Sequence, residues 1–457
     1  MKRTVVLNVV GLTRSVLERM PKLWEWSKLG TLATIDSMGI PAVTCAMQAC
    51  YLTGKYPSDH GIVGNGWYFK DECEVKFWRQ SNALVKAPKV WEMARSINPS
   101  FTCANLFWWY NMYSSVDYAV TPRPMYPADG RKLPDIYTQP SSLRDVLQQE
   151  LGTFPLFKFW GPATTIESSQ WIANAAKWTE SKYGPTLSLV YLPHLDYCAQ
   201  QLGEYPDREL QAIDQVVYDL IAFFESRNVQ IMVLSEYGIT PVSQPVHLNR
   251  VLRSQGWLTI REELGLELLD AGASQAFAVA DHQVAHVYIN NLSIIDQVKS
   301  VLEQTPGVAK VLTRDLQREY HLDHERSGDL VILSEPQAWF TYYYWNDDTK
   351  APDFARTVDI HRKPGYDPVE LFINPQIKFP KLKVAMTLLN RKLGGRSLMD
   401  LTPLDANLVQ GSHGLRSPNL DDRPLVITQQ TELLKLLENS SIEAPKICSL
   451  ILQHLHN

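Results

Sequence analysis

The sequence predicts an α/β protein built on a mostly parallel sheet with helices on both faces. Three apolar, β-branched runs, at residues 4–10, 187–192 and 229–235, have the character of buried strands. Between the second and third runs, residues 209–227 place their apolar side chains on one helical face. A strand, a helix and a further strand of this kind indicate a crossover connection between parallel strands.

The remaining elements follow in chain order. After the first run, which is too short for a signal peptide, we expect a helix at residues 20–28. Beyond about residue 270 the pattern changes to a mixed α+β region. The expected elements there are strands within 277–290, 329–334 and 339–345, a helix at 294–302, a loop at 347–380 and a last helix at 430–438. This organisation predicts a core at 1–270, an inserted cap region at 271–400 and a return to the core at 401–457.

Composition excludes several classes of protein. The 457 residues are 45% hydrophobic and 20% charged, a globular balance. A net charge of −5 and the lack of a Lys/Arg cluster argue against general nucleic-acid binding. No apolar run reaches the roughly 18–20 residues of a membrane-spanning helix. Six scattered cysteines without a CxxC pair favour the reducing cytoplasm and argue against a thiolate zinc site. The oligomeric state stays open.

Polar residues follow the predicted strands at the edge where active sites of parallel sheets lie. Thr44 comes shortly after Pro41, where a helix over residues 45–52 is expected to begin. The N-terminus of a helix offers free N–H groups and a partial positive charge, which favour an anion such as phosphate. A hydroxyl there can act as a nucleophile, although a simple N-cap role for Thr44 is the alternative.

The surrounding motif gives Thr44 a more specific interpretation. Residues 40–65 read IPAVTCAMQACYLTGKYPSDHGIVGN, with Pro-x-x-Thr followed by TG-x-YP-x-x-HGI-x-GN. This spacing resembles the nucleotide pyrophosphatase/phosphodiesterase (type I phosphodiesterase) family of the alkaline phosphatase superfamily. The resemblance implies an alkaline-phosphatase-like fold with an inserted α+β cap. It also implies Thr44 as the nucleophile and a site that holds two divalent metal ions.

Two of the family's metal-binding landmarks keep their ligands. Tyr191-Leu-Pro-His-Leu-Asp196 matches the strand that ends in a ligating Asp, and Gly411-Ser-His413-Gly matches the Gly-x-His-Gly landmark. The resemblance therefore assigns Asp196 and His413 to a metal, with Zn, Mn or Mg as the expected ions.

The other landmarks are altered. Gln200 stands where the family has a His four residues after the Asp, and Glu236-Tyr237 replaces Asp-His. Where the family has an Asp before Gly11, Asn8 is the nearby polar candidate. Glu236 and Asn8 are thus the weaker expected ligands, and Tyr237 is a poor substitute for His because its hydroxyl ordinarily stays protonated.

Four histidines are candidates to complete the site. In an extended segment His194 would point the same way as Asp196, and on a strand His282 and His286 would share a face. His361 lies in a polar, turn-rich segment, and we rank it with His282 ahead of the other two. Each of the four could instead have an ordinary hydrogen-bonding role.

Further residues have two readings each. Asn65 either fixes loop geometry, as we expect for the neighbouring His60, or faces substrate. The aromatic clusters at 106–113 and 339–345 either stack against a planar group or, as we favour, pack in the interior. Arg123, Arg131 and Lys132 either neutralise phosphate or are solvated surface residues.

These observations predict a metal-dependent hydrolase of phosphodiester or pyrophosphate bonds that acts on a small phosphorylated metabolite or nucleotide. The alternative is a metal-poor relative that binds a phosphorylated or aromatic metabolite without hydrolysing it. A phosphomutase stays open, whereas a sulfatase is disfavoured because the sequence around Cys45 lacks Cys/Ser-x-Pro-x-Arg.

Overall fold

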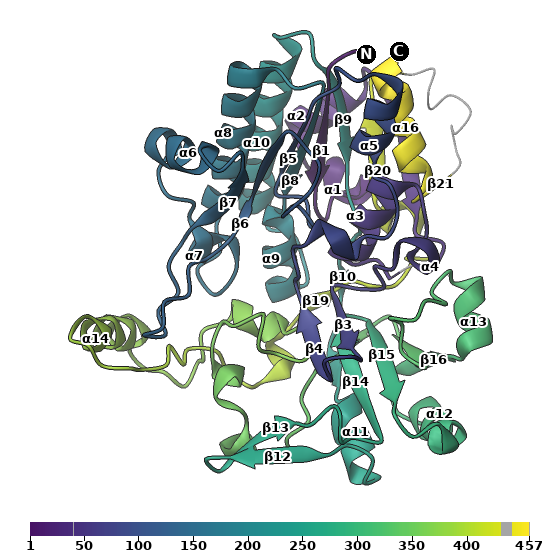
Figure 1. The fold of residues 1–457 in the computed structure, drawn as a ribbon, viewed down its shortest axis with the longest axis vertical. Helices are drawn as coiled ribbons and strands as arrows, with labels where there is room; N and C mark the ends of the chain where they lie inside the picture. The colour runs from purple at the N-terminus through teal and green to yellow at the C-terminus, as the bar shows by residue number, and fades with distance from the viewer. Residues whose placement is uncertain (40, 431–440, 457) are drawn as a thin grey trace.

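The centre of the fold is a nine-stranded sheet (Figure 1). The computed structural model describes residues 1–39, 41–430 and 441–456. In spatial order the strands are β21 (Ser441–Glu443), β2 (Thr31–Asp36), β20 (Leu425–Thr428), β9 (Gln230–Leu234), β1 (Thr4–Val9), β8 (Leu187–Leu192), β5 (Cys103–Leu106), β6 (Tyr118–Pro122) and β7 (Ile136–Gln139). The central strands β9, β1, β8, β5 and β6 are parallel, whereas β20 and β7 run antiparallel to their neighbours. The predicted α/β class with a mostly parallel sheet is confirmed.

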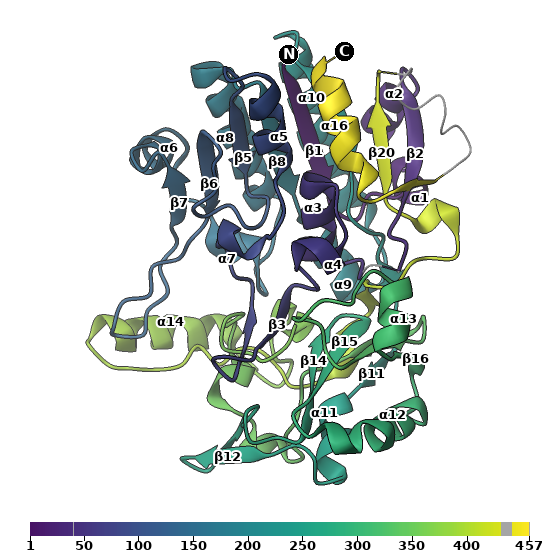
Figure 2. The same cartoon turned by 45° about the vertical axis from the view of Figure 1, so that its right-hand side comes forward.

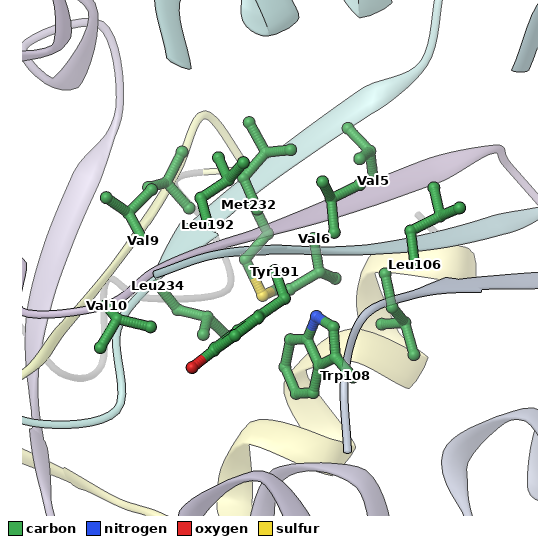
Figure 3. Packing of buried hydrophobic residues seen from close by; sticks show 14 of the residues in the cluster. Val5, Val6, Val9, Val10, Leu106, Trp108, Tyr191, Leu192, Met232 and Leu234 are labelled. Atoms are coloured by element: carbon green, nitrogen blue, oxygen red, sulfur yellow. The ribbon is translucent and has the colours of Figure 1, made fainter. Parts of the chain in front are cut away.

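The central strands are buried on both faces because helices cover each side. Every residue of β1 and β8 is buried, as their continuous apolar character predicts. Figure 2 shows α3, α5 and α16 on one face and α8 and α10 on the other. Figure 3 shows side chains of neighbouring strands, among them Val6, Leu106 and Met232, packed in the resulting core. The helices of this part are α1 (Arg14–Leu17), α2 (Pro21–Ser27), α3 (Thr44–Thr53), α4 (Pro57–His60), α5 (Val90–Ile97), α6 (Leu143–Leu151), α7 (Leu156–Phe159), α8 (Glu167–Tyr183), α9 (His194–Leu202), α10 (Asp207–Glu225) and α16 (Lys446–His456).

A second core lies below the carboxyl ends of the central strands in Figure 1. Its main element is a four-stranded antiparallel sheet of β14 (Ala276–Asp281), β15 (Val284–Ile289), β17 (Leu330–Ser334) and β16 (Val308–Leu312). The other elements are β3 (Gly66–Phe69), β4 (Glu74–Phe77), β10 (Thr240–Pro241), β11 (Gln244–Val246), β12 (Ile260–Glu263), β13 (Leu266–Leu269), β18 (Ala338–Phe340), β19 (Gly411–Ser412), α11 (Leu248–Ser254), α12 (Ile295–Glu303), α13 (Arg314–Glu319) and α14 (Pro380–Lys392). This core also takes in residues near position 60, so chain segments far apart in sequence build it together.

The local expectations differ from the structure in two places, and a third expectation is not tested. The strand expected at 339–345 stops at Phe340, and the aromatic residues after it are buried without strand pairing. The expected helix at 430–438 falls almost entirely outside the described residues. Helix α14, for which no element was predicted, has no buried residue. No helix in the described ranges is long and apolar enough to cross a membrane.

Candidate functional site

The candidate site lies where β1, β8 and β9 end, below the central sheet (Figure 1). Asn8 is the last but one residue of β1, and Glu236 follows β9. Asp196 lies in the first turn of α9, which follows β8 directly. Thr44 is the first residue of α3, and Val43 rather than Thr44 occupies the N-cap position. The hydroxyl of Thr44 is therefore not used as the N-cap.

Glu236 is surrounded by neutral amide groups. Asn8 Nδ2 and Gln48 Nε2 each donate a hydrogen bond of 2.5 Å to Glu236 Oε1. The other carboxyl oxygen, Oε2, is buried and has no hydrogen-bond partner among the described residues. Burial raises the pKa of Glu236 to about 8, although both amide hydrogen bonds lower it. At neutral pH this carboxyl group is therefore mostly protonated.

Thr44, Tyr237 and Asp196 form a hydrogen-bonded row. Thr44 Oγ1 lies 3.1 Å from the Tyr237 hydroxyl, which donates to Asp196 Oδ1 at 3.3 Å. Gln200, one turn further along α9, donates to Asp196 Oδ2 at 2.9 Å and accepts from the Tyr366 hydroxyl at 2.7 Å. Burial raises the pKa of Asp196 to about 7, against the lowering effect of the bonds from Gln200 and Tyr237.

His413 is held beside this row by backbone contacts. Its Nδ1 lies 2.7 Å from the Ala42 carbonyl, which requires a donated N–H there and leaves Nε2 as an acceptor, 3.7 Å from Asp196 Oδ1. Burial lowers the pKa of His413 well below its ordinary value, so the ring is neutral. Gly411, two residues before His413, has no room for a side chain, because a Cβ there would lie 2.1 Å from the Ala199 carbonyl oxygen.

His282 lies in the turn between β14 and β15, next to the ring of His413. The two ring centroids are 3.8 Å apart, and Tyr366 stacks on His282 at 3.6 Å. Asp281 accepts from His282 Nδ1 at 2.8 Å and from Asn65, through its backbone N–H at 2.7 Å and its side-chain amide at 3.0 Å. Burial lowers the pKa of His282 well below its ordinary value. Two neutral imidazoles therefore line this side of the site.

A pocket connects the inner part of the site to the surface. It encloses about 950 Å³, the solvent at its mouth included. Thr44, Asp196, Tyr237, His282 and His413 line its inner end. Aromatic residues line its walls, namely Trp78, Trp109, Tyr126, Phe157, Phe159, Trp160, Tyr191, Tyr197 and Tyr366. At the outer end lie Arg123 and Lys132, from the segment that joins β6 to β7, and neither forms an ion pair with any described residue.

The four histidines expected near the site have different positions. His282 and His361 line the pocket, His361 toward its outer end, where burial lowers its pKa to about 4. His286 does not line it: its Nε2 donates to the Val63 carbonyl at 3.1 Å. The expectation for His194 rested on an extended segment and is wrong, because the segment is helical and His194 bonds to Glu209. The shared-face argument for His282 also fails, because that residue lies in a turn.

Of the other candidate residues, some line the pocket and some do not. Asn65 lies behind the site, where its Oδ1 accepts from the Cys45 backbone N–H at 3.0 Å. Of the aromatic clusters, Trp109 reaches the pocket, whereas Trp339 and Trp345 are buried in the second core. Arg131 lies outside the pocket and pairs with Asp129.

Two contributors to the site were missed. Gln48 lies one helical turn after Thr44, so its i, i+4 spacing on α3 was a usable signal. Tyr366 belongs to a segment without regular periodicity, and only the tertiary structure brings it beside Gln200.

The residues present do not fit the two-metal site that the resemblance implies. Asn8 directs an amide N–H at Glu236, and Gln200 directs one at Asp196, so hydrogen-bond donors face the carboxyl groups where a cation would lie. Burial raises the pKa of Tyr237 well above its ordinary value, which disfavours a phenolate ligand. Within the described residues, no three His, Cys, Asp or Glu side chains are arranged to hold one ion.

Comparison with known structures finds similar folds at low sequence identity. A phosphonoacetate hydrolase from Sinorhizobium meliloti 1021, in complex with phosphonoformate, is 13% identical with a TM-score of 0.63, over 99% of this chain and 96% of that chain. Murine ectonucleotide pyrophosphatase/phosphodiesterase 5 is 13% identical with a TM-score of 0.57, over 100% and 95% of the two chains. The human protein of that name is 12% identical with a TM-score of 0.58, over the same shares.

The sequence itself matches a family model. No curated protein sequence matches the chain. The model described as type I phosphodiesterase / nucleotide pyrophosphatase, however, matches residues 4–367. The resemblance read from residues 40–65 is thereby confirmed, and the chain belongs to the type I phosphodiesterase / nucleotide pyrophosphatase family of phosphoric ester hydrolases.

Proposed function

We propose that the protein hydrolyses a phosphodiester or pyrophosphate bond of a small phosphorylated substrate, with Thr44 as the nucleophile. The observation that carries this proposal is the hydrogen-bonded row from Thr44 through Tyr237 to Asp196 at the start of α3. A hydroxyl that faces a pocket and is linked to a carboxyl group with a pKa of about 7 has the arrangement of an activated nucleophile. The N-terminus of α3 adds a partial positive charge for the phosphoryl group.

The row supplies the proton transfer. As the Thr44 oxygen attacks phosphorus, its proton passes to the Tyr237 oxygen while the Tyr237 proton passes to Asp196. The bond from Thr44 to phosphorus forms, the bond from phosphorus to the leaving oxygen breaks, and the proton now on Asp196 passes, relayed by water, to the leaving oxygen. A water molecule then attacks phosphorus, breaks the bond to Thr44 and gives a proton to the Thr44 oxygen, which restores the hydroxyl group and leaves Asp196 as it began. One water is consumed overall.

Burial of the two carboxyl groups reduces their repulsion of an anionic substrate. Glu236, with a pKa of about 8, is mostly neutral at pH 7, and Asp196, with a pKa of about 7, is neutral about half of the time. The residues of this chain can thus accept a phosphate group next to two acidic side chains. No step of this scheme runs through a metal ion, since the donor set does not fit one.

The pocket walls indicate the class of substrate. Closely packed aromatic rings, such as those of Trp78 and Trp109 with centroids 4.9 Å apart, favour a planar group next to the phosphate. Arg123 and Lys132 at the outer end favour a second anionic group on the same molecule. We therefore propose a phosphorylated substrate that carries an aromatic moiety and a further acidic group. All six cysteines are free thiols, which supports the cytoplasm as the location.

A second candidate is a protein that binds such a compound without hydrolysing it. The observation that favours it is the set of amide groups, from Asn8, Gln48 and Gln200, that bind the two carboxyl groups. In that case the pocket would retain affinity for a phosphorylated aromatic ligand but would not turn it over.

Hydrolysis of bis-p-nitrophenyl phosphate against p-nitrophenyl phosphate tests the proposal. We expect turnover of the diester, a loss of about 10³-fold or more in Thr44→Ala, and partial activity in Thr44→Ser. Mass spectrometry of a quenched reaction with the diester should find a p-nitrophenyl phosphoryl group on Thr44. Binding of the diester without turnover by the wild type would favour the second candidate, and full activity of Thr44→Ala would contradict the nucleophile.

A further inference from the structure

Helix α14 displays an apolar row that no part of the described chain covers. The helix projects at the edge of the molecule in Figure 1, and none of its residues is buried. The row consists of Phe379, Leu382, Met386, Leu389 and Leu393, which are between 57% and 79% exposed. Their spacing of three and four residues places them on one face of the helix. So many large, exposed apolar side chains in one row mark an interaction surface.

The same segment is strongly basic although the chain as a whole is acidic. Residues 376–399 contain six Lys and Arg and no Asp or Glu, in a chain of net charge −5. Lys378, Lys381, Lys392 and Arg396 are exposed and form no ion pair with the described residues. Lys383, which lies on the inward side, pairs with Asp400 at 2.8 Å. Apolar residues separate most of these basic residues, so the segment does not form a compact Lys/Arg cluster in the sequence.

The apolar row and the basic residues together indicate which kind of surface α14 can bind. A second copy of the helix would bring two strongly positive segments together, which disfavours a dimer through this face. An apolar row flanked by cations is typical of helices that lie in the interface of a membrane with anionic lipids. We propose that α14 docks the protein on an anionic lipid bilayer, with the apolar row at the level of the acyl chains and the basic residues among the headgroup phosphates.

The position of α14 relative to the pocket gives this docking a consequence. A hollow between α14 and the segment that joins β6 to β7 is lined by Leu388 and Arg391 on one side and by Arg131 and Lys132 on the other. Lys132 also lines the outer end of the pocket that contains Thr44. Docking through α14 would therefore hold the mouth of the pocket near the bilayer. The proposal does not depend on whether Thr44 performs catalysis.

Vesicle sedimentation of the full chain tests the proposal. We expect binding to phosphatidylcholine vesicles that contain phosphatidylserine, little binding to phosphatidylcholine alone, and weaker binding at high salt. Lys381→Gln with Lys392→Gln should lower the partition coefficient about 25-fold, since each basic residue contributes about fivefold near such a surface. Met386→Glu with Leu389→Glu should abolish binding. Leu264→Glu, at a fully exposed leucine in the turn between β12 and β13, is the matched control and should bind as the wild type does.

Each of three outcomes would overturn the proposal. The first is a wild-type protein that does not sediment with anionic vesicles, and the second is equal sedimentation with neutral ones. The third is concentration-dependent self-association, measured by analytical ultracentrifugation, that Met386→Glu with Leu389→Glu removes, because it would assign the row to a second copy. These substitutions are at exposed positions, so circular dichroism should show the fold unchanged.

Discussion

The two ends of the pocket that contains Thr44 differ in how they manage charge. At the inner end, Asp196 and Glu236 are buried and take their hydrogen bonds from neutral amide and hydroxyl groups. At the outer end, Arg123 and Lys132 lie among aromatic rings without an ion-pair partner in the described chain. Protonation thus neutralises most of the charge of Glu236 and part of that of Asp196, whereas the basic end is left for a ligand.

This difference separates chemistry from recognition. The inner end has titratable groups whose pKa values lie near neutrality, which suits proton transfer. The outer end has the cationic side chains of Arg123 and Lys132, the latter with a pKa that burial lowers, and planar surfaces that suit the binding of an aromatic anion. Changes at the inner end should therefore alter kcat, whereas changes at the outer end should alter KM.

Apart from loss of the Thr44 nucleophile itself, the largest expected effect is at Tyr237. Tyr237→Phe keeps the ring stacked on His413 but interrupts the row between Thr44 and Asp196. We expect kcat to fall by about 10²–10³-fold with little change in KM, because the proton of Thr44 loses its path. Steady-state kinetics should be compared with Tyr366→Phe, which removes a buried hydroxyl that bonds to Gln200. Equal losses in the two variants would show that Tyr237 has only a packing role.

A second effect concerns stability and pH at Glu236. Its pKa in the folded protein, about 8, lies above its ordinary value of 4.5, so the folded state holds a proton that the unfolded state releases. Its contribution to stability is complete below pH 4.5 and is lost as the pH rises through 8. Between pH 6 and pH 8 we expect a loss of about 2–3 kcal/mol in urea unfolding. Glu236→Gln should remove this part of the pH dependence and leave the smaller part that the raised pKa of Asp196 contributes, whereas Glu263→Gln, at an exposed strand position, should leave the whole dependence unchanged. An unchanged slope in Glu236→Gln would contradict a raised pKa.

The sequence predicts the fold and much of the inner end because both depend on local patterns. The buried strands β1, β8 and β9 are continuous apolar runs, and residues directly after such strands meet at one edge of a parallel sheet. Asp196 and Glu236 could be anticipated at that edge for this reason. Asn8 and Gln200 were also candidates, but their role as hydrogen-bond donors to the two carboxyl groups could not be anticipated, because it depends on side-chain orientation.

The outer end and α14 were harder to anticipate. Lys132 belongs to an irregular connection, and nothing in its neighbours predicts that it reaches the pocket. His361 was anticipated as a titratable residue, but its distance along the pocket from Thr44 depends on the tertiary structure. Helix α14 has a clear helical period, but it begins where the loop expected at 347–380 ends, and no element was predicted for the residues that follow.

A third effect tests the outer end. Lys132→Met should raise KM about 10-fold for an aromatic phosphodiester that carries a carboxylate and should leave KM unchanged for the uncharged analogue, because one charge-assisted hydrogen bond is lost. Arg131→Met removes a cation from the same connection but outside the pocket and serves as the control. If Lys132→Met left the KM for the carboxylate-bearing substrate at its wild-type value, the acidic group of the substrate would not bind at Lys132.

The smallest expected effect, on removal of divalent metal, tests the inner end most directly. If protonated carboxyl groups and neutral amides replace the metal ions of the family, kcat/KM should change by less than about twofold after dialysis against EDTA, and elemental analysis should find less than one metal ion per chain.

A variant in which the metal ligands of the family are restored should, in contrast, depend on metal. The combined variant Asn8→Asp, Gln200→His, Glu236→Asp and Tyr237→His removes two of the amide donors and supplies carboxylate and imidazole ligands beside Asp196 and His413. We expect this variant to bind Zn²⁺ and to lose it to EDTA. Tight zinc binding by the wild type would contradict the exclusion of metal by the hydrogen-bond donors at Asp196 and Glu236.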